Sequence, residues 1–170
     1  MKYLFSNILV VFFLTLSVTT AMAGAPKLKP YTGNIKNPSL VLKDLSGKTH
    51  DLAQYKNQVV LVQFWATYCT PCRTEMPSMN RLQNKLKGKN FKILAVDMAE
   101  ETEEVLTFVK EVKPEFTILL DTDGTYIQKW KVFAAPANFI IGKDGTIKYT
   151  LYGGVEWDSD TIVKKLTELM

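Results

Sequence analysis

Apolar residues along this chain recur in two patterns, one typical of buried strands and the other typical of helices. The run from Val59 to Trp65 is almost wholly apolar and has the length of a strand that is covered on both faces of its sheet. Residues 72–86 instead carry apolar side chains three or four positions apart, as on one face of a helix, and Gly88 follows as a stop signal. The two patterns predict a buried strand that leads directly into a helix.

The rest of the sequence repeats this alternation of strand and helix patterns. Strands are predicted at residues 40–42, 49–52, 91–96, 117–120, 137–141 and 146–151, and helices at residues 102–112, at residues 125–130 and from residue 159 to the C-terminus. A turn at residues 46–48 joins the first two of these strands into a hairpin. Strands that alternate with helices in this way are typical of an α/β sandwich around a mixed sheet.

The first 23 residues have the three parts of a secretory signal peptide. Lys2 is basic, residues 8–18 form an apolar core, and Ala21-Met22-Ala23 is a small-x-small cleavage site. The eleven apolar residues are too few to span about 30 Å of hydrocarbon, so we expect cleavage after Ala23 and export of the chain, to the periplasm or an equivalent compartment. The alternative is an uncleaved membrane anchor that starts at Tyr3.

Two segments are expected after the signal peptide. Residues 24–37 contain prolines and glycines and lack a periodic pattern, which predicts an irregular lead-in. Residues 38–170 have the length of one ordinary domain. The full chain has 21 basic and 17 acidic residues, and its net charge of +4 is spread along the sequence without a dense basic block, so nucleic-acid binding gains no support.

Both cysteines of the chain, Cys69 and Cys72, lie between the buried strand and the helix that follows it. A disulfide between residues three positions apart closes a very short loop and stabilises a fold little, so a purely structural disulfide is a poor explanation. A zinc site would need two more ligands, and His50 is the only histidine. The spacing therefore favours a redox-active dithiol, which suits an oxidising compartment.

The turn that holds the two cysteines also suggests different roles for them. A helix that begins near Cys72 would point its free N–H groups at Cys69 and stabilise a thiolate there. Cys69 would then attack a partner disulfide, and Cys72 would resolve the mixed disulfide. Pro71 suits the first turn of a helix because it lacks an N–H, and Arg73 adds a cation nearby.

Two segments of the sequence resemble the thioredoxin superfamily. They read WATYCTPCRTEMP at residues 65–77 and VFAAPANFIIGKDG at residues 132–145. Within the superfamily, residues 38–170 are most similar to the secreted TlpA/ResA-like thiol-disulfide oxidoreductases. The positions shared with that group are a tryptophan, two cysteines with a proline between them, and a glutamate and a proline that follow: Trp65, Cys69, Pro71, Cys72, Glu75 and Pro77.

The resemblance implies a thioredoxin-like three-layer sandwich with a central mixed β-sheet and an added N-terminal β-hairpin. It also implies a cis peptide bond at Ala135–Pro136, opposite the dithiol, which would leave the preceding backbone free to pair with a bound substrate. The implied docking surface around the first cysteine is shallow and apolar and consists of Tyr68, Pro71, Ala135 and the Gly153–Gly154 pair.

One position departs from the thioredoxins proper. Gln63 stands six residues before Cys69, where they carry a buried aspartate that handles the proton of the resolving thiol. An amide cannot act as a base, so another group or a bridging water must take that role. Glu75, one helical turn after Cys72, matches the acidic residue of the TlpA/ResA-like group, and burial would raise its pKa into a useful range. The alternative for Glu75 is a solvated carboxylate that complements the start of a helix.

The function implied by the resemblance is reduction of protein disulfides in an oxidising compartment. Pro71, directly before Cys72, resembles the reducing branch of the family. The partners would be disulfide-bearing proteins and a membrane dithiol relay that supplies electrons, and cytochrome c maturation is a familiar process for such relatives. No cofactor is expected, because the sequence holds no nicotinamide or flavin motif.

Three other functions compete with this one. A disulfide-forming oxidant would use the same cysteines in the opposite direction. A peroxidase of the related peroxiredoxins would need Thr or Ser, and Pro, where Ala66 and Val62 stand. A copper chaperone would bind the metal with both cysteines and with a third ligand such as Met76 or the distant His50.

Two further expectations concern polar residues outside the dithiol. The acidic residues between Glu100 and Glu104 precede and begin a predicted helix, whose dipole they complement. A metal site or a partner patch is the minor alternative for this acidic run. His50 is expected on the surface of the hairpin.

Overall fold

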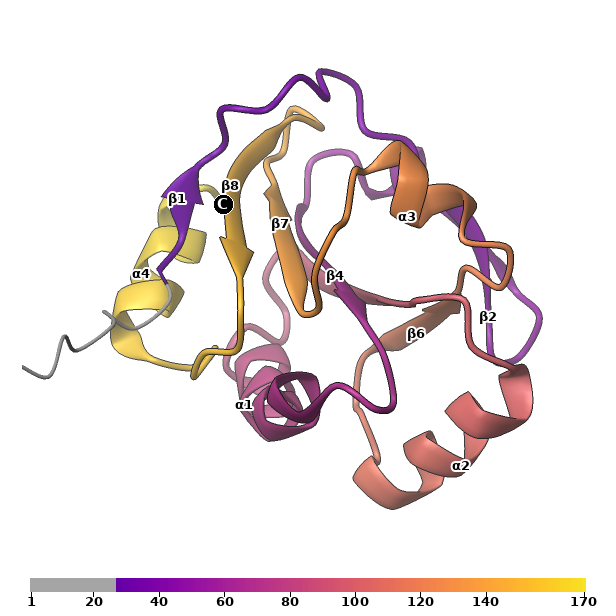
Figure 1. Cartoon of the computed structure of the whole chain (residues 1–170). Coiled ribbons are helices and arrows are strands. Elements are labelled where there is room, and N and C mark those ends of the chain that lie inside the picture. Colours follow the sequence, from indigo (N-terminus) through magenta and orange to yellow (C-terminus); the bar gives the residue numbers. More distant parts are fainter. Residues whose placement is uncertain (1–26) are drawn as a thin grey trace, which may run out of the picture.

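The computed structural model describes residues 27–170 and shows the predicted alternation of strands and helices (Figure 1). The predicted signal peptide, residues 1–23, lies outside the described residues. The elements in chain order are β1 (Lys29–Pro30), β2 (Val41–Asp44), β3 (Thr49–Asp51), the 3₁₀ helix η1 (Leu52–Tyr55), β4 (Val59–Trp65), α1 (Thr70–Lys85), β5 (Phe91–Asp97), α2 (Thr102–Val112), β6 (Thr117–Leu120), α3 (Thr125–Lys129), β7 (Ala137–Ile141), β8 (Ile147–Tyr152) and α4 (Asp160–Glu168). In this part of the chain, none of the helices combines the length and the hydrophobicity that a membrane span requires.

The eight strands form one mixed sheet in the order β1-β8-β7-β4-β5-β6-β2-β3. β4 lies inside the sheet, parallel to β5 and antiparallel to β7, and β5 is in turn parallel to β6. Helices connect the parallel neighbours, as the geometry of parallel strands requires. β2 and β3 form the predicted N-terminal hairpin. The expected mixed sheet with an added hairpin is therefore confirmed.

Each face of the sheet is covered by its own hydrophobic core, which makes three layers (Figure 1). Helices α1, α2 and α4 contribute to one core, which includes Trp65 and both cysteines. Helix α3 and η1 contribute to the other core, in which Phe64 and Trp130 pack. All seven residues of β4 are buried because a core lies on each side of the strand.

The lead-in is less irregular than its sequence predicts. Lys29 and Pro30 form the short strand β1, which pairs with Thr150 and Tyr149 of β8, and Leu28 beside it is buried. Two paired residues are too few to leave a period in the sequence, and proline is tolerated there because β1 lies at the edge of the sheet. The sheet thus extends into the segment that was expected to precede the domain.

His50 is buried, so its expected place on the surface of the hairpin is wrong. Its Nε2 lies 2.7 Å from Asp44 Oδ2, and its Nδ1 lies 2.7 Å from the hydroxyl oxygen of Tyr55. Hydrogen bonds from Ser46 and His50 hold the pKa of Asp44 well below its usual range. The hairpin pattern could not reveal this burial, because η1, which follows the hairpin, places Tyr55 against the imidazole ring.

Helix α3 leads toward Pro136, and a buried aspartate fixes its start. Asp121 is fully buried and accepts hydrogen bonds from the backbone N–H groups of Tyr126 and Ile127. Gly124 makes the turn between them with a φ of 67°, a conformation that residues with a Cβ atom rarely adopt. The loop that contains Pro136 therefore leaves from an anchored helix.

Replacing Asp121 with Ala should lower the free energy of unfolding by about 1–3 kcal/mol, because buried N–H groups lose their acceptor. Urea denaturation at pH 7 measures this change. The matched control is Asp123→Ala, which removes an exposed carboxylate that accepts a hydrogen bond from the backbone N–H of Thr125 and should cost less than about 1 kcal/mol. Equal losses in the two variants would contradict a special role for Asp121.

Candidate active site

Cys69 and Cys72 lie at the start of α1, directly after the connection from β4. They form a disulfide with Cα atoms 5.3 Å apart, a distance that their spacing predicts. Cys69 is the N-cap residue of α1, and the backbone N–H of Cys72 points at its sulfur, with the nitrogen 3.3 Å away. Cys69 is 8% exposed, whereas Cys72 is fully buried. Of the two cysteines, only the first borders solvent.

Pro71 lies in the first turn of α1 and faces the loop that follows β8. A Cβ atom at Gly154 would stand 3.1 Å from the carbonyl oxygen of Pro71 and 3.6 Å from Glu75 Oε2. A glycine permits this approach without displacing the backbone. Gly153 has a φ of 98°, which also favours glycine. The pair of glycines therefore allows the loop to close against the dithiol turn.

The Ala135–Pro136 peptide bond is cis and lies at the same end of the sheet as the dithiol. β7 begins at Ala137, which pairs with the last part of β4 and, on its other side, with Tyr152 at the end of β8. The carbonyl oxygen of Pro136 accepts a hydrogen bond from Gly153 N at 3.0 Å. Ala135 packs against the core that contains both cysteines. The proline loop and the glycine loop thus converge beside α1.

Tyr68 is placed differently from the other residues expected to form a docking surface. Its neighbour Cys69 is held by a backbone hydrogen bond to Ala66, and the Tyr68 side chain is 76% exposed. Gly154 approaches Pro71, and Ala135 packs against the core that contains the cysteines, whereas the side chain of Tyr68 extends into solvent.

Glu75 is buried beneath the dithiol turn, not solvated on the helix surface. It is 2% exposed, and its Oε2 accepts hydrogen bonds from Val155 N at 3.1 Å and from Trp157 Nε1 at 3.0 Å. Its Oε1 accepts a hydrogen bond from Gln63 Nε2. Burial raises the pKa of Glu75 to about 8, although these three donors favour the charged form. The carboxyl group therefore titrates in a range that is useful for proton transfer at neutral pH.

Gln63 and Asn138 complete a buried polar cluster with Glu75 between α1 and the sheet. They are direct register partners on β4 and β7, so their side chains leave the same face of the sheet. Gln63 Nε2 also lies 3.2 Å from the sulfur of Met79. Gln63 Oε1 and Asn138 Oδ1 find no hydrogen-bond partner within residues 27–170. The sequence singled out Gln63 but gave no reason to suspect Asn138.

Asp97 and Glu100 form a second acidic site, which sequence reasoning missed. Glu100 accepts hydrogen bonds from the backbone N–H of Thr67, at 2.6 Å, and from its hydroxyl, so it fastens the loop that leads to Cys69. Glu100 N in turn donates to Asp97 Oδ2 at 3.1 Å. Burial, with a further contribution from Glu100, raises the pKa of Asp97. Dipole complementation therefore does not explain the whole acidic run, and within residues 27–170 no three His, Cys, Asp or Glu side chains are grouped as metal ligands.

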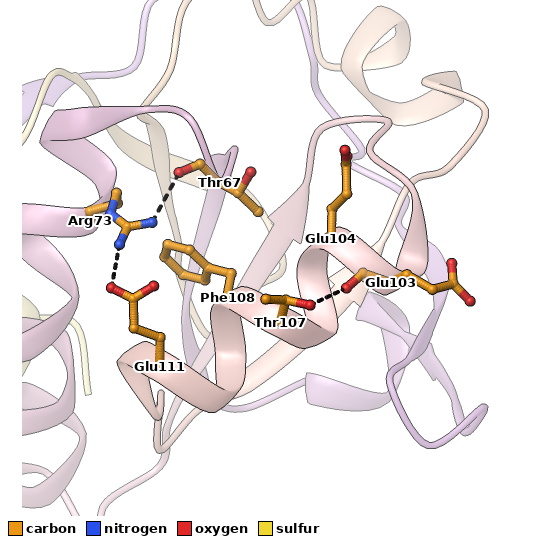
Figure 2. A pocket seen from close by; sticks show the side chains of 7 residues that line it. All are labelled: Thr67, Arg73, Glu103, Glu104, Thr107, Phe108 and Glu111. Atoms are coloured by element: carbon orange, nitrogen blue, oxygen red, sulfur yellow. Dashed lines mark hydrogen bonds and ion pairs between the residues drawn. The ribbon is translucent and has the colours of Figure 1, made fainter.

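Arg73 is engaged by α2 and is not a free cation beside the dithiol. Figure 2 shows its guanidinium group between Thr67 and Glu111, next to the ring of Phe108. Nη2 lies 2.7 Å from Glu111 Oε1, and Nη1 lies 3.5 Å from the carbonyl oxygen of Thr67. The surface cleft beside it, of about 450 Å³, is lined by Thr67, Arg73, Glu103, Glu104, Thr107, Phe108 and Glu111. Arg73 thereby ties the first turn of α1 to α2.

Several known proteins are similar to this chain in sequence. The model of the AhpC/TSA family matches residues 34–150. The thiol-disulfide oxidoreductase ResA of Bacillus thuringiensis subsp. konkukian is 38% identical over 116 residues, which cover 68% of this chain and 67% of that protein. ResA of Bacillus subtilis is 32% identical over 116 residues, which cover 68% of this chain and 65% of that protein.

Solved structures have the same fold. A Chlorobium tepidum protein described as the thiol:disulfide interchange protein DsbE superimposes with a TM-score of 0.74 at 29% identity, over 84% of this chain and 99% of that one. A thioredoxin-family thiol:disulfide interchange protein from the same organism gives a TM-score of 0.69 at 24% identity, over 81% of this chain and 97% of that one, which supports the fold alone. Together with the buried strand, the dithiol turn and the matching sequences, these likenesses show that the chain belongs to the AhpC/TSA family and is a ResA-like thiol-disulfide oxidoreductase with a thioredoxin-like fold.

Proposed function

We propose that this enzyme reduces disulfides in other proteins through a mixed disulfide on Cys69. The observation that carries the proposal is the difference between the two sulfur atoms. Cys69 borders solvent at the N-terminus of α1, whereas Cys72 is fully buried. The N–H of Cys72, 3.3 Å from the Cys69 sulfur, would stabilise a thiolate there. Cys69 is therefore the nucleophile and Cys72 the resolving cysteine.

The reaction transfers two electrons from the enzyme dithiol to the substrate disulfide. The Cys69 thiolate attacks one substrate sulfur, which breaks the substrate S–S bond, forms the mixed disulfide and releases the first substrate thiolate. The Cys72 thiolate then attacks the Cys69 sulfur, which releases the second substrate thiolate and leaves the enzyme oxidised. The Cα separation of 5.3 Å in the enzyme disulfide is compatible with the second step.

Glu75 is the group that receives the proton of the Cys72 thiol before the second step. It lies one helical turn beyond Cys72, and with a pKa of about 8 it is able to take up and release a proton near neutrality. Gln63 cannot replace it as a base, but its amide holds the carboxyl group by a hydrogen bond. Water would carry the proton where the sulfur and the carboxyl group do not touch.

The docking surface consists of Tyr68, Pro71, Ala135, Pro136 and Gly153. The cis bond at Pro136 leaves the backbone of Ala135 outside β7, where it is able to pair with an extended substrate segment. The glycine at position 153 supports the proline through a backbone hydrogen bond. A shallow surface of this kind makes few contacts, so the covalent bond to Cys69 holds the substrate in place.

The site of action is an exported, oxidising compartment, with residues 1–23 as the cleaved signal and with the predicted domain, residues 38–170, extended by Leu28 and β1, as the catalytic domain. The sequence pattern of the first 23 residues supports export. Because each cycle leaves the enzyme oxidised, a dithiol donor must reduce it again, and a membrane dithiol relay is the donor that this location favours.

Changing Cys69 to Ser should abolish reduction of insulin disulfides, because no nucleophile remains. Changing Cys72 to Ser should preserve the first step and trap mixed disulfides, which mass spectrometry of the unreduced protein detects. The opposite pattern in the two variants would overturn the assignment of the two cysteines.

The reduction potential of the Cys69/Cys72 pair should be about −270 mV or lower, as in thioredoxin. Equilibration with dithiothreitol or glutathione buffers measures it. A potential near about −120 mV would mean that the pair gives its disulfide away, and the enzyme would then be an oxidant in place of a reductant.

Replacing Glu75 with Gln should make the stability of the oxidised protein less dependent on pH. The pKa of Glu75 is raised from 4.5 to about 8, so between these values the folded protein keeps a proton that the unfolded chain releases. This contribution to stability is fully present below about pH 4.5 and is lost as the pH rises through about 8. Urea denaturation between about pH 5 and 9 measures how steeply the free energy of unfolding changes with pH. One proton held only by the folded state contributes a slope of at most about 1.4 kcal/mol per pH unit.

Two further variants make this measurement specific. Asp97→Asn removes another buried carboxyl with a raised pKa, so it should also reduce the slope, and the variant with both substitutions should reduce it further. Glu104→Gln removes an exposed carboxylate and is the matched control for the loss of one acidic side chain. If the free energy of unfolding of Glu75→Gln depends on pH as steeply as that of the wild type, Glu75 is excluded as a group that holds a proton in the folded state.

A further inference from the structure

Three large apolar side chains among residues 27–170 are substantially exposed, and two of them belong to the loops around the dithiol. The exposed fractions are 79% for Phe133, 76% for Tyr68 and 45% for Val41. Tyr68 directly precedes Cys69, and Phe133 lies three residues before Pro136. Exposed apolar side chains beside a reaction centre are candidates for contact with a partner.

Phe133 is held in place, although it is exposed. Its ring stacks on the ring of Tyr152, with centroids 4.4 Å apart and an angle of 23° between the planes. Tyr152 in turn packs edge-on against Phe139, in the core on the face of the sheet opposite the cysteines, and its neighbour Gly153 donates a hydrogen bond to Pro136. Phe133 is therefore an exposed aromatic residue in a fixed position, in the same loop as the cis proline.

The backbone around Phe133 is open to pairing. Within residues 27–170, the N–H groups of Phe133, Ala134 and Ala135 find no backbone acceptor. Ala135 packs against the core that contains Cys69, and two residues of extended chain span at most about 7 Å. A polypeptide that brings its sulfur to Cys69 and pairs with Ala135 must therefore pass close to Phe133.

We propose that Phe133 is a specificity residue that selects substrates with a large apolar side chain about three residues from the reacting cysteine. The inference rests on the proposed function, because the occupant is the segment of the disulfide-bearing protein that Cys69 attacks. If the segment pairs with the backbone of residues 133–135, the substrate residue next to the cysteine would lie opposite Ala135, and the residue two positions further would lie opposite Phe133, whose ring stacks on Tyr152. A leucine or an aromatic side chain there would bury the exposed ring, whereas a polar side chain would leave it in water.

The test uses two peptides with one cysteine each, both joined as mixed disulfides to 5-thio-2-nitrobenzoate. They are identical except for Leu or Ser at the third position on each side of the cysteine. Attack by the reduced enzyme on the peptide sulfur forms the Cys69–peptide disulfide and releases the coloured thiolate, which is the better leaving group. We expect kcat/KM to be about tenfold higher for the Leu peptide with the wild type, equivalent to about 1.4 kcal/mol.

Phe133→Ser should reduce this preference to less than about twofold, and Phe133→Leu should keep most of the preference. Val41→Ser is the matched control, since it removes an exposed apolar side chain from β2, on the far part of the sheet, and should keep the full preference. A preference that survives in Phe133→Ser, or is missing in the wild type, overturns the inference. If the wild type releases the coloured thiolate from neither peptide, the proposed function itself is overturned, and the inference with it.

Discussion

Strand β4 has no face that meets water, and this constraint determines where the reactive pair lies. Because all seven of its residues are buried, helices must cover the sheet on both sides, and the chain reaches the surface only after Trp65. Helix α1 then has to return along the same strand to bury Met76, Met79 and Leu82 in the core. The N-terminus of this helix is consequently held beside the end of β4, where its N-cap residue, Cys69, borders solvent.

The polar groups of the site lie at the boundary of that core, where burial changes their chemistry. The thioredoxins proper carry an acid on the strand, whereas this chain carries an amide there, Gln63, and places the acid on the helix as Glu75. Three donors hold the carboxyl group, so its orientation is fixed while burial keeps it partly protonated near neutrality. Ala66 and Val62 are both buried and apolar, so the positions at which a peroxidase would need Thr or Ser, and Pro, supply neither.

The sequence predicted those parts of the fold whose signal is local and strong. The bounds of β4, α2, β6 and β7 agree with the predicted ranges, because continuous apolar runs and helical periods each reflect burial by the element itself. β1 could not be predicted, since two edge residues have no period. The burial of His50 depends on Tyr55 of another element, and the hydrogen bonds between Glu100 and Thr67 join residues 33 positions apart. Such contacts arise from the assembled sheet, so no window of sequence contains them.

The run of open backbone amides before Pro136 is short, and its length affects how long a partner stays. Only three residues are open, because the next residue is a proline without an N–H and β7 begins directly after it. Each hydrogen bond made there would contribute only about 0.5–1.5 kcal/mol net. A partner held by so few bonds leaves quickly once its covalent bond to Cys69 is broken. The resolving attack of Cys72 would then also be the product-release step, and turnover would need no separate opening of the fold.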